Sequence, residues 1–320
     1  MSLALQGGGS HGAFTWGVLD RLLEDERIVL DGVSGASAGA INAALVAHGL
    51  AQGGRAGARA ALREFWQSVA TAMPSVPAET LLTLMRFLAP YQLNPFNLNP
   101  LRELLSRQID FDSLRAASPV RLFISATDVF SGMARIFGTR EITLEALLAS
   151  TCLPSLNQAV AIGDSAYWDG GLTANPPLRP LVYQCEASDI LIVRLQPESR
   201  AGIPRTVEDI SSRFNEISFS STLHSEIQGI ALAKREAERR AFALGRLERR
   251  LRRLNLHAIG PTALVASMDV ASRLKTDARL LDLLFTEGRE QASAWLAAHF
   301  DLIGVRSTLP LARHLQLAPA

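Results

Sequence analysis

A serine flanked by small residues is the first position in this chain whose surroundings could support chemistry. Ser37 lies in Gly35-Ala36-Ser37-Ala38-Gly39, a G-x-S-x-G pattern between an expected strand and an expected helix. Small neighbours let the chain fold back sharply, so the hydroxyl projects outward, and the helix N-terminus offers amides to developing negative charge. The pattern favours Ser37 as a nucleophile, although a loop rich in glycine and alanine also produces it by chance.

A glycine loop precedes this turn. The segment Gly7-Gly8-Gly9-Ser10-His11-Gly12 follows the apolar run Leu3-Ala4-Leu5. Successive glycine amides at the start of a helix can stabilise the oxyanion of an acyl transfer, because no side chain stands in the way. The same glycines fit a G-x-G-x-x-G dinucleotide fingerprint, and acidic residues occur between Asp25 and Asp31. However, the second strand runs straight into the serine turn instead of ending in a ribose-binding carboxylate, which favours the oxyanion interpretation.

An aspartate followed by two glycines is the third element. Asp169-Gly170-Gly171 comes directly after the apolar pair Tyr167-Trp168. On such a loop the carboxylate can approach Ser37 and act as its general base without an intervening histidine. An ordinary D-G turn is the alternative interpretation of this short motif.

In this order and spacing the three motifs resemble the patatin-like phospholipase family, whose relatives include the catalytic domains of cytosolic phospholipase and neuropathy target esterase. Its glycine-rich loop, its nucleophile elbow and its D-G-[GA] motif are similar to the three segments above. Ala149-Ser150-Thr151-Cys152-Leu153-Pro154 looks like the A-S-x-x-x-P block of the family, and Asn175-Pro176-Pro177 like its N-x-P. The resemblance covers about residues 1–200.

The resemblance implies a lipid acyl hydrolase, of phospholipase A or carboxylesterase type, that works through an acyl-enzyme. Its catalytic dyad would be Ser37 and Asp169, and its substrate a lipid or another acyl ester, with no cofactor and no metal. The remaining implied site residues are glycines: Gly7, Gly8, Gly9 and Gly12 in the oxyanion hole, and Gly35, Gly39, Gly170 and Gly171 in the motifs. The family often has Arg or Lys where this chain has His11, so we hypothesise that His11 tunes the loop.

Two other functions stay open on the sequence. An α/β-hydrolase triad has the chain order serine, acid, histidine, and four histidines follow Asp169: His224, His257, His299 and His314. Few strands precede Ser37 for that fold, and His257 lies in an apolar run typical of a structural residue. The second alternative is a catalytically silent protein that binds a lipid or a partner in the same pocket.

Composition limits the class of protein. The 320 residues are 48% hydrophobic, and 32 basic side chains nearly balance 31 acidic ones, so no overall charge favours nucleic acid. The two cysteines, Cys152 and Cys185, form neither a disulfide framework nor a zinc pattern. We see no secretory signal and no apolar run long enough to span a membrane, which predicts a cytoplasmic protein of undetermined oligomeric state.

Alternating strand and helix patterns must position these motifs. Apolar runs predict strands at 3–5, 28–33, 120–127, 133–137, 159–162, 166–168, 189–195 and 256–259, and helical spacing predicts a final helix over 276–300. We therefore expect a patatin-like three-layer α/β/α fold with a mostly parallel central sheet. Residues 1–200 would form the catalytic domain, and residues 201–320 a mostly helical C-terminal extension packed on the same domain.

Two segments raise the question of membrane contact. The apolar segment 81–91 suits either a core helix or a mobile cap over the site. Lys234–Arg253 holds nine basic and three acidic residues, with Leu244, Leu247, Leu251 and Leu254 at helical spacing. One basic amphipathic helix there would suit either an anionic membrane surface or packing with a solvated charged face.

Overall fold

Short apolar runs form the strands of one mixed sheet. The computed structural model describes residues 1–72, 88–198, 202–239, 245–268 and 270–315. Its strands are β1 (Ser2–Leu5), β2 (Gly32–Gly35), β3 (Arg121–Asp128), β4 (Ala134–Gly138), β5 (Val160–Ile162), β6 (Ser165–Asp169), β7 (Asp189–Val193) and β8 (Asn255–Ile259). Their order is β5-β6-β3-β2-β1-β7-β8, with β4 paired to β3. The run β3-β2-β1-β7-β8 is parallel, so its carboxyl ends share one edge.

Both faces of the parallel strands are buried, which explains their continuous apolar sequences. In β1, Leu3 and Leu5 enter one core while Ala4 enters the other, and β7 alternates in the same way. The helices that cover the first core are α1 (Gly12–Glu24), α2 (Ala38–Ala72), α5 (Pro100–Gln108), α6 (Phe111–Ala117), α7 (Leu144–Ser150) and α12 (Ala278–His299). The second core is covered by α8 (Arg179–Gln184), α9 (Val207–Arg239) and α10 (Arg246–Arg253), with α13 (Leu311–His314) packed on α9.

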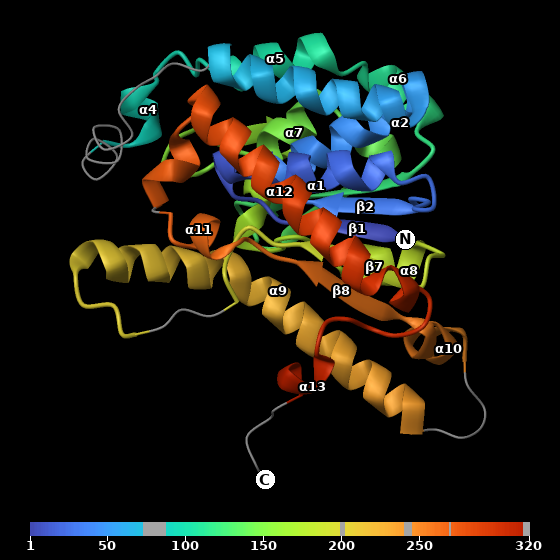
Figure 1. Cartoon of the computed structure of the whole chain (residues 1–320). Helices are drawn as coiled ribbons and strands as arrows, with labels where there is room; N and C mark the ends of the chain where they lie inside the picture. The colour runs from blue at the N-terminus through green and yellow to red at the C-terminus, as the bar shows by residue number, and fades with distance from the viewer. Residues whose placement is uncertain (73–87, 199–201, 240–244, 269, 316–320) are drawn as a thin grey trace.

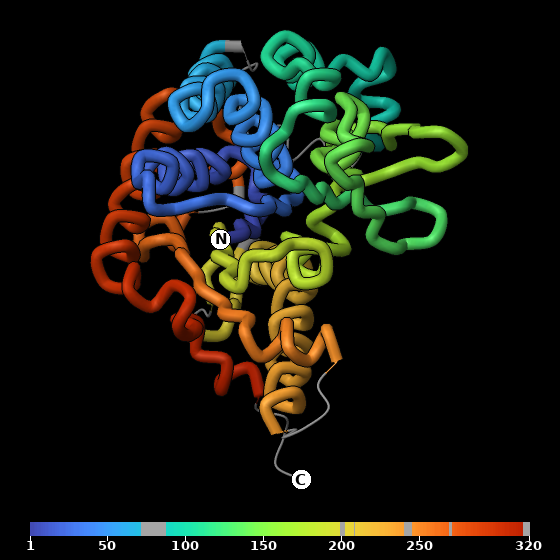
Figure 2. Tube along the Cα trace, turned by 90° about the vertical axis from the view of Figure 1, so that its right-hand side faces the viewer, coloured from blue at the N-terminus to red at the C-terminus, as the bar shows by residue number. Residues whose placement is uncertain are grey.

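The expected three-layer fold is confirmed, with helices above and below the sheet (Figure 1). Figure 2 shows the blue N-terminal segment at the centre, between the green middle region and the orange and red C-terminal elements. The C-terminal region does more than add helices, because β8 pairs with β7 as an edge strand of the same sheet. None of the helices within the described residues is both long and apolar enough to span a bilayer.

Two expected elements differ from the structure. The second strand begins at Gly32, since Ile28, Val29 and Leu30 lie in a loop where Val29 is exposed and Ile28 is buried. A single helix over Lys234–Arg253 is also wrong, because α9 and α10 are separate elements and Gly245 before α10 has extended backbone angles. The leucines that suggested one helix all follow the end of α9 at Arg239, so their spacing carried no information about where α9 ends.

Candidate active site

Ser37 occupies a strained turn between β2 and α2. Its φ is 53°, in the left-handed region that non-glycine residues rarely adopt. The turn is tight because Gly39 passes the end of β1 so closely that an added Cβ would lie 2.1 Å from the carbonyl oxygen of Leu5. The Ser37 amide donates to Ser150 Oγ at 3.0 Å, which holds the turn from the neighbouring helix α7. The predicted strand, sharp turn and helix are all present around this serine.

Asp169 ends β6 and is fully buried. Its Oδ1 accepts a hydrogen bond from the Gly171 amide at 2.7 Å, and its backbone carbonyl accepts one from Thr127 Oγ1 at 2.8 Å. Burial raises the pKa of Asp169 to about 7, against opposing interactions with the Ser37 hydroxyl and the Gly171 amide. Among the described residues, Oδ2 has no hydrogen bond of standard geometry.

The glycine loop lies against this turn. Its hydrogen bonds reduce the number of glycine amides that could act as the expected oxyanion donors. The Gly7 amide donates to Asn175 Oδ1 at 2.7 Å, and the Gly12 amide points to the carbonyl oxygens of Gly9 and Ser10. Within the described residues, the amides of Gly8 and Gly9 have no such acceptor. The amides of Gly7 and Gly12 are therefore used within the protein, and of the four predicted donors the amides of Gly8 and Gly9 remain as candidates.

Gly9 shows why this loop is made of glycine. Its φ is +59°, and an added Cβ would lie 2.3 Å from the Arg273 carbonyl oxygen. Arg273 belongs to η4 (Val270–Leu274), so the C-terminal region packs directly on the glycine loop. His11, one turn further on, is buried and its Nε2 lies 2.8 Å from Ser272 Oγ of the same η4. The hypothesis that His11 tunes the loop stays a prediction.

Two buried asparagines position the motifs, and sequence analysis gave neither of them a role. Asn175 links the glycine loop to α9, because its Nδ2 also donates to the Phe219 carbonyl oxygen at 2.9 Å. Asn42 donates from Nδ2 to the Gly12 carbonyl oxygen at 3.0 Å and accepts from Trp66 Nε1 at 3.0 Å. Asn42 is a polar residue within the apolar run after Ser37, and this could have indicated a structural role for it. Asn175 was noticed only as part of the N-x-P resemblance.

One cavity of about 390 Å³ brings the predicted residues together. Ser37 and Asp169 line it together with Gly7, Gly8 and Gly9. The other predicted glycines do not line it and lie close to neighbouring backbone or side-chain atoms: Gly12, Gly35, Gly39, Gly170 and Gly171. Most of its wall is apolar, from α2, α5 and the loop after α7: Ile41, Phe65, Trp66, Val69, Leu101, Leu153 and Leu156. Such a wall suits an acyl chain.

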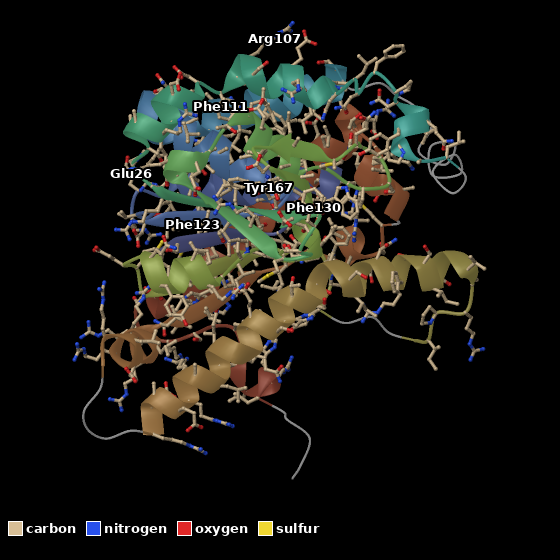
Figure 3. All side chains as sticks on the ribbon, turned by 180° about the vertical axis from the view of Figure 1, so that it is seen from behind. Glu26, Arg107, Phe111, Phe123, Phe130 and Tyr167 are labelled. Atoms are coloured by element: carbon tan, nitrogen blue, oxygen red, sulfur yellow. The ribbon has the colours of Figure 1, made fainter. Side chains whose placement is uncertain are left out.

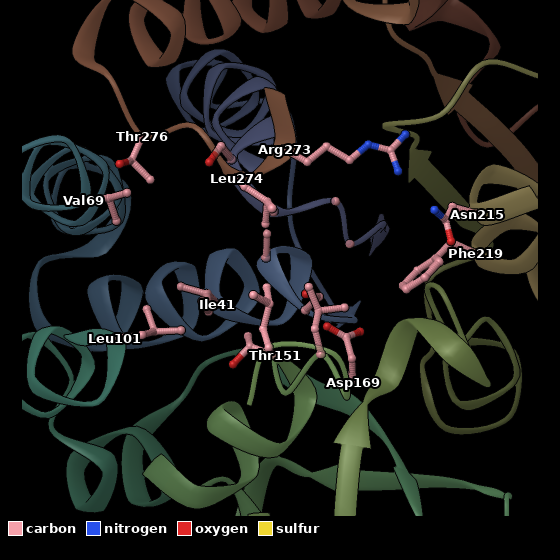
Figure 4. Close-up of a pocket in the computed structure, with 18 of the residues that line it drawn as sticks. Ile41, Val69, Leu101, Thr151, Asp169, Asn215, Phe219, Arg273, Leu274 and Thr276 are labelled. Carbon is pink, nitrogen blue, oxygen red and sulfur yellow. The ribbon is translucent and has the colours of Figure 1, made fainter. Parts of the chain in front are cut away.

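The cavity lining also holds polar residues. Figure 4 shows Asn215 and Arg273 across the cavity from Val69 and Leu101, with Phe219 beside Asn215, and Gln196 belongs to the lining as well. Gln196 is buried, and within the described residues neither atom of its side-chain amide has a hydrogen-bond partner. A buried amide that lines a cavity is available to hydrogen-bond the polar part of a substrate.

The histidines of the alternative triad lie elsewhere in the described structure. None of the described residues that line the cavity is a histidine. His257 instead bonds Asp189 Oδ1 at 3.0 Å, and Asp189 begins β7 at the amino edge of the sheet, away from Ser37. His224 and His314 lie near each other, with ring centroids 6.4 Å apart, and burial lowers the pKa of both. Nothing in this geometry favours a triad.

Two other expectations concern the surroundings of the site. Residues 81–87 of the apolar segment lie outside the described residues, while Pro90–Leu93 form the short helix α4. The basic side chains of the Lys234–Arg253 region make internal contacts: Lys234 Nζ donates to the Arg252 carbonyl oxygen, and Arg250 donates to the carbonyl oxygens of Val182, Glu186 and Ala187. These contacts join α9, α8 and α10, so some of the basic side chains hold these helices together.

A comparison with protein-family models identifies the family. A family model described as patatin-like phospholipase matches residues 3–182, more than half of the chain. No curated protein matches it. Solved structures that match include VipD from Legionella pneumophila, with 13% identity, a TM-score of 0.47, and coverage of 98% of this chain and 72% of that chain. The type III effector protein ExoU matches with 15% identity, a TM-score of 0.36, and coverage of 95% and 53%.

Proposed function

Since the chain belongs to the patatin-like phospholipase family, we propose that it is a lipid acyl hydrolase with Ser37 as nucleophile and Asp169 as general base. The observation that carries this proposal is the strained Ser37 beside the buried Asp169 in one largely apolar cavity. A serine hydroxyl needs a neighbouring base to attack an ester, and a carboxyl with a pKa near neutrality can take and return a proton at neutral pH.

In the proposed reaction, Asp169 takes the proton of the Ser37 hydroxyl as the oxygen attacks the carbonyl carbon of the ester. The amides of Gly8 and Gly9 donate to the oxyanion of the tetrahedral intermediate, and the N-terminus of α2 adds a favourable dipole. Asp169 then gives its proton to the leaving alcohol, which leaves an acyl group on Ser37. Water attacks this acyl-enzyme by the same sequence and releases the carboxylic acid.

Burial of Asp169 serves this mechanism in two ways. The Gly171 amide holds Oδ1 of the carboxyl group, and Thr127 holds the backbone carbonyl oxygen of the same residue, so both the side chain and its backbone are fixed beside the serine turn. Its raised pKa makes it a stronger base than an exposed aspartate, so less free energy is needed to transfer the proton from serine. We therefore assign the acid and base steps to the same carboxyl group.

Hydrolysis of a soluble p-nitrophenyl ester tests the proposal. We expect Ser37→Ala and Asp169→Asn each to lower kcat by at least about 1,000-fold, as for other groups that act as one catalytic unit. A fluorophosphonate should label the wild-type protein at Ser37 only. Ser221→Ala, which removes an exposed serine of α9, is the matched control and should keep full activity.

Three results would contradict the assignment. Full activity in Ser37→Ala would exclude the nucleophile, and a large loss in His257→Ala with the fold intact would favour the triad. A protein that binds lipid but neither hydrolyses esters nor reacts with the fluorophosphonate would be the silent binding protein.

A further inference from the structure

The first half of α9 exposes a stripe of large apolar side chains. Val207, Ile210, Phe214 and Ile217 follow one another at intervals of three and four residues, and are 69%, 53%, 69% and 50% exposed. Intervals of three and four place side chains on one face of a helix. Ile203, just before the helix, is exposed as well. We call these five residues the apolar stripe.

The apolar stripe stops after Ile217. From Ser218 to Arg239 no described large apolar side chain is exposed, and the exposed residues are small or charged: Ser221, Ser225, Gly229, Ala233, Glu236, Glu238 and Arg239. The other face of the helix is buried throughout its second half, with Leu223, Ile227 and Ile230 in the core. The later part of α9 therefore has a solvent-facing side without large apolar side chains, as is usual for a surface helix, whereas the part before Ser218 exposes apolar side chains to solvent.

Chain topology places the apolar stripe at the edge of the sheet where the cavity lies. α9 follows the carboxyl end of β7 and runs back toward the amino end of β8, so its first half lies at the carboxyl edge. Ser37 follows the carboxyl end of β2, which is that same edge. Asn215 and Phe219, in the same part of α9, line the cavity itself.

A second apolar group lies at this edge. Phe130 and Met133 are exposed in the turn between β3 and β4, which begins at the carboxyl end of β3. In the view of Figure 3 Phe130 is drawn above the middle of α9, and the first half of that helix projects past the end of the sheet there and in Figure 1. Exposed apolar side chains from two segments far apart in sequence thus lie at the carboxyl edge of the sheet, and such patches mark interaction surfaces.

We infer that the apolar stripe is a lipid-docking surface that seats the carboxyl edge of the sheet on a bilayer, so that an acyl chain enters the cavity without crossing water. This inference rests on the proposed function, because only a lipid substrate has to leave a bilayer. An amphipathic helix lying in the interface buries its apolar face among the lipid headgroups and upper acyl chains. The stripe lies at the same edge of the sheet as the cavity that we assign to an acyl chain, and this position identifies the lipid surface as its partner.

The same topology argues against docking through the basic helix α10. α10 leads directly into the amino end of β8, so it lies at the edge opposite Ser37. A membrane held by Arg246, Arg249 and Arg253 would face away from the cavity. Contact through the apolar stripe therefore predicts binding that depends on apolar insertion more than on anionic lipid.

Vesicle sedimentation in the inactive Ser37→Ala background tests the inference without any catalysis. The test variant is Ile210→Asp with Phe214→Asp. The matched control is Ser221→Asp with Ser225→Asp, because it places the same charges at the same spacing on the second half of α9. We expect the test variant to bind phosphatidylcholine vesicles at least tenfold more weakly than the parent, and the control to bind as the parent does. Adding phosphatidylserine should change this pattern little.

Activity supplies a second readout in the active protein. The test pair should reduce hydrolysis of vesicle phospholipid at least tenfold while leaving hydrolysis of a soluble p-nitrophenyl ester unchanged. An Ile210→Ser and Phe214→Ser pair, with its melting temperature compared to wild type, shows that the loss does not come from unfolding. If no ester is hydrolysed at all, the proposed function fails, while sedimentation still tests the docking surface.

Several results would overturn the inference. Equal vesicle binding by parent and test variant, absence of binding by the parent, or an equal loss in the control pair would each do so. Light scattering adds one more case. A dimer of the parent that the test pair dissociates, with vesicle binding unchanged, would make the stripe a contact between two copies of the chain.

Discussion

As the proposed general base, Asp169 has to be ionised before it can accept a proton, and its buried position opposes ionisation. Burial raises its pKa to about 7, and the contacts with Ser37 and Gly171 offset only part of that effect. We therefore expect kcat/KM for a soluble ester to fall about tenfold for each pH unit below about 7, because only the ionised fraction of the free enzyme reacts. A pH profile with an uncharged p-nitrophenyl ester measures this.

The control for this profile is recovery of full activity after the acidic samples are returned to about pH 8, which separates titration from unfolding. A rate that stays constant down to about pH 5 would contradict a raised pKa for the reacting carboxyl group.

The same pKa has a consequence for stability. Between about pH 4 and pH 7 the folded protein keeps a proton on Asp169 that the unfolded chain has lost, so the free energy of unfolding decreases as the pH rises through this range. Asp169→Asn removes the effect and keeps an acceptor oxygen for the Gly171 amide. We expect the variant to match wild type near pH 4 and to be more stable by a few kcal/mol above about pH 7.

Urea unfolding at several pH values measures this difference. A variant that is less stable than wild type at every pH would show that the carboxylate contributes more through its contacts than it costs through burial. In either case the inactive variant would separate the stability of the site from its chemistry, since active sites commonly sacrifice stability for function.

At the level of single residues, sequence analysis could find Ser37 and Asp169 because short motifs surround them. It could not separate Gly8 and Gly9 from Gly7 and Gly12, because that distinction depends on hydrogen bonds from Asn175 and within the loop. Asn175 and Asn42 reach their partners across many intervening residues, so no local pattern identifies their roles.

At the level of secondary-structure elements, the turn from β2 into α2 requires the backbone of α2 to pass very close to the backbone of β1. Gly39 lies in the first turn of α2, where a Cβ would overlap the Leu5 carbonyl oxygen of β1. Gly39→Ala must therefore push α2 away from the sheet or prevent folding, and we expect a loss of more than about 3 kcal/mol together with loss of activity. Urea unfolding and ester hydrolysis measure the two effects.

A matched glycine shows that the effect comes from position. Gly229 is an exposed residue inside α9 with no atom within 4 Å of an added Cβ. Gly229→Ala should stabilise the protein by up to about 1 kcal/mol through helix propensity and leave hydrolysis unchanged. Equal effects of the two substitutions would show that the packing at Gly39 is not a tight constraint.

Elements were predicted where the local pattern is strong. Most strands, including β7 and β8, match their predicted segments closely. A strand that is buried on both faces has a continuous run of apolar residues, which is easy to find in a sequence. The loop residues Ile28, Val29 and Leu30 have the same apolar character, and only their lack of pairing partners separates them from β2. The division between α9 and α10 depends on the backbone at Gly245, which leucine spacing does not reveal.

In the whole molecule, the region after residue 200 completes the structure that the catalytic motifs need. β8 pairs with all five residues of β7, and α12 packs along α1. α9 and α10 supply a large share of the second core: Leu223, Ile227, Ile230, Ala237 and Leu251. The cavity also depends on this region, because Asn215, Phe219, Arg273, Leu274 and Thr276 belong to its lining.

We therefore expect a chain of residues 1–200 alone not to fold, although it contains every predicted catalytic residue. It would expose β7 as an unpaired edge and leave its share of the second core open to water, a combination that favours aggregation. The full chain should unfold in a single cooperative transition, because the two regions share one sheet and both cores. Near-UV circular dichroism with thermal melting of both chains checks this expectation. A soluble, monomeric 1–200 chain with its own cooperative transition would show that the catalytic part is an independent domain, to which the later elements merely add.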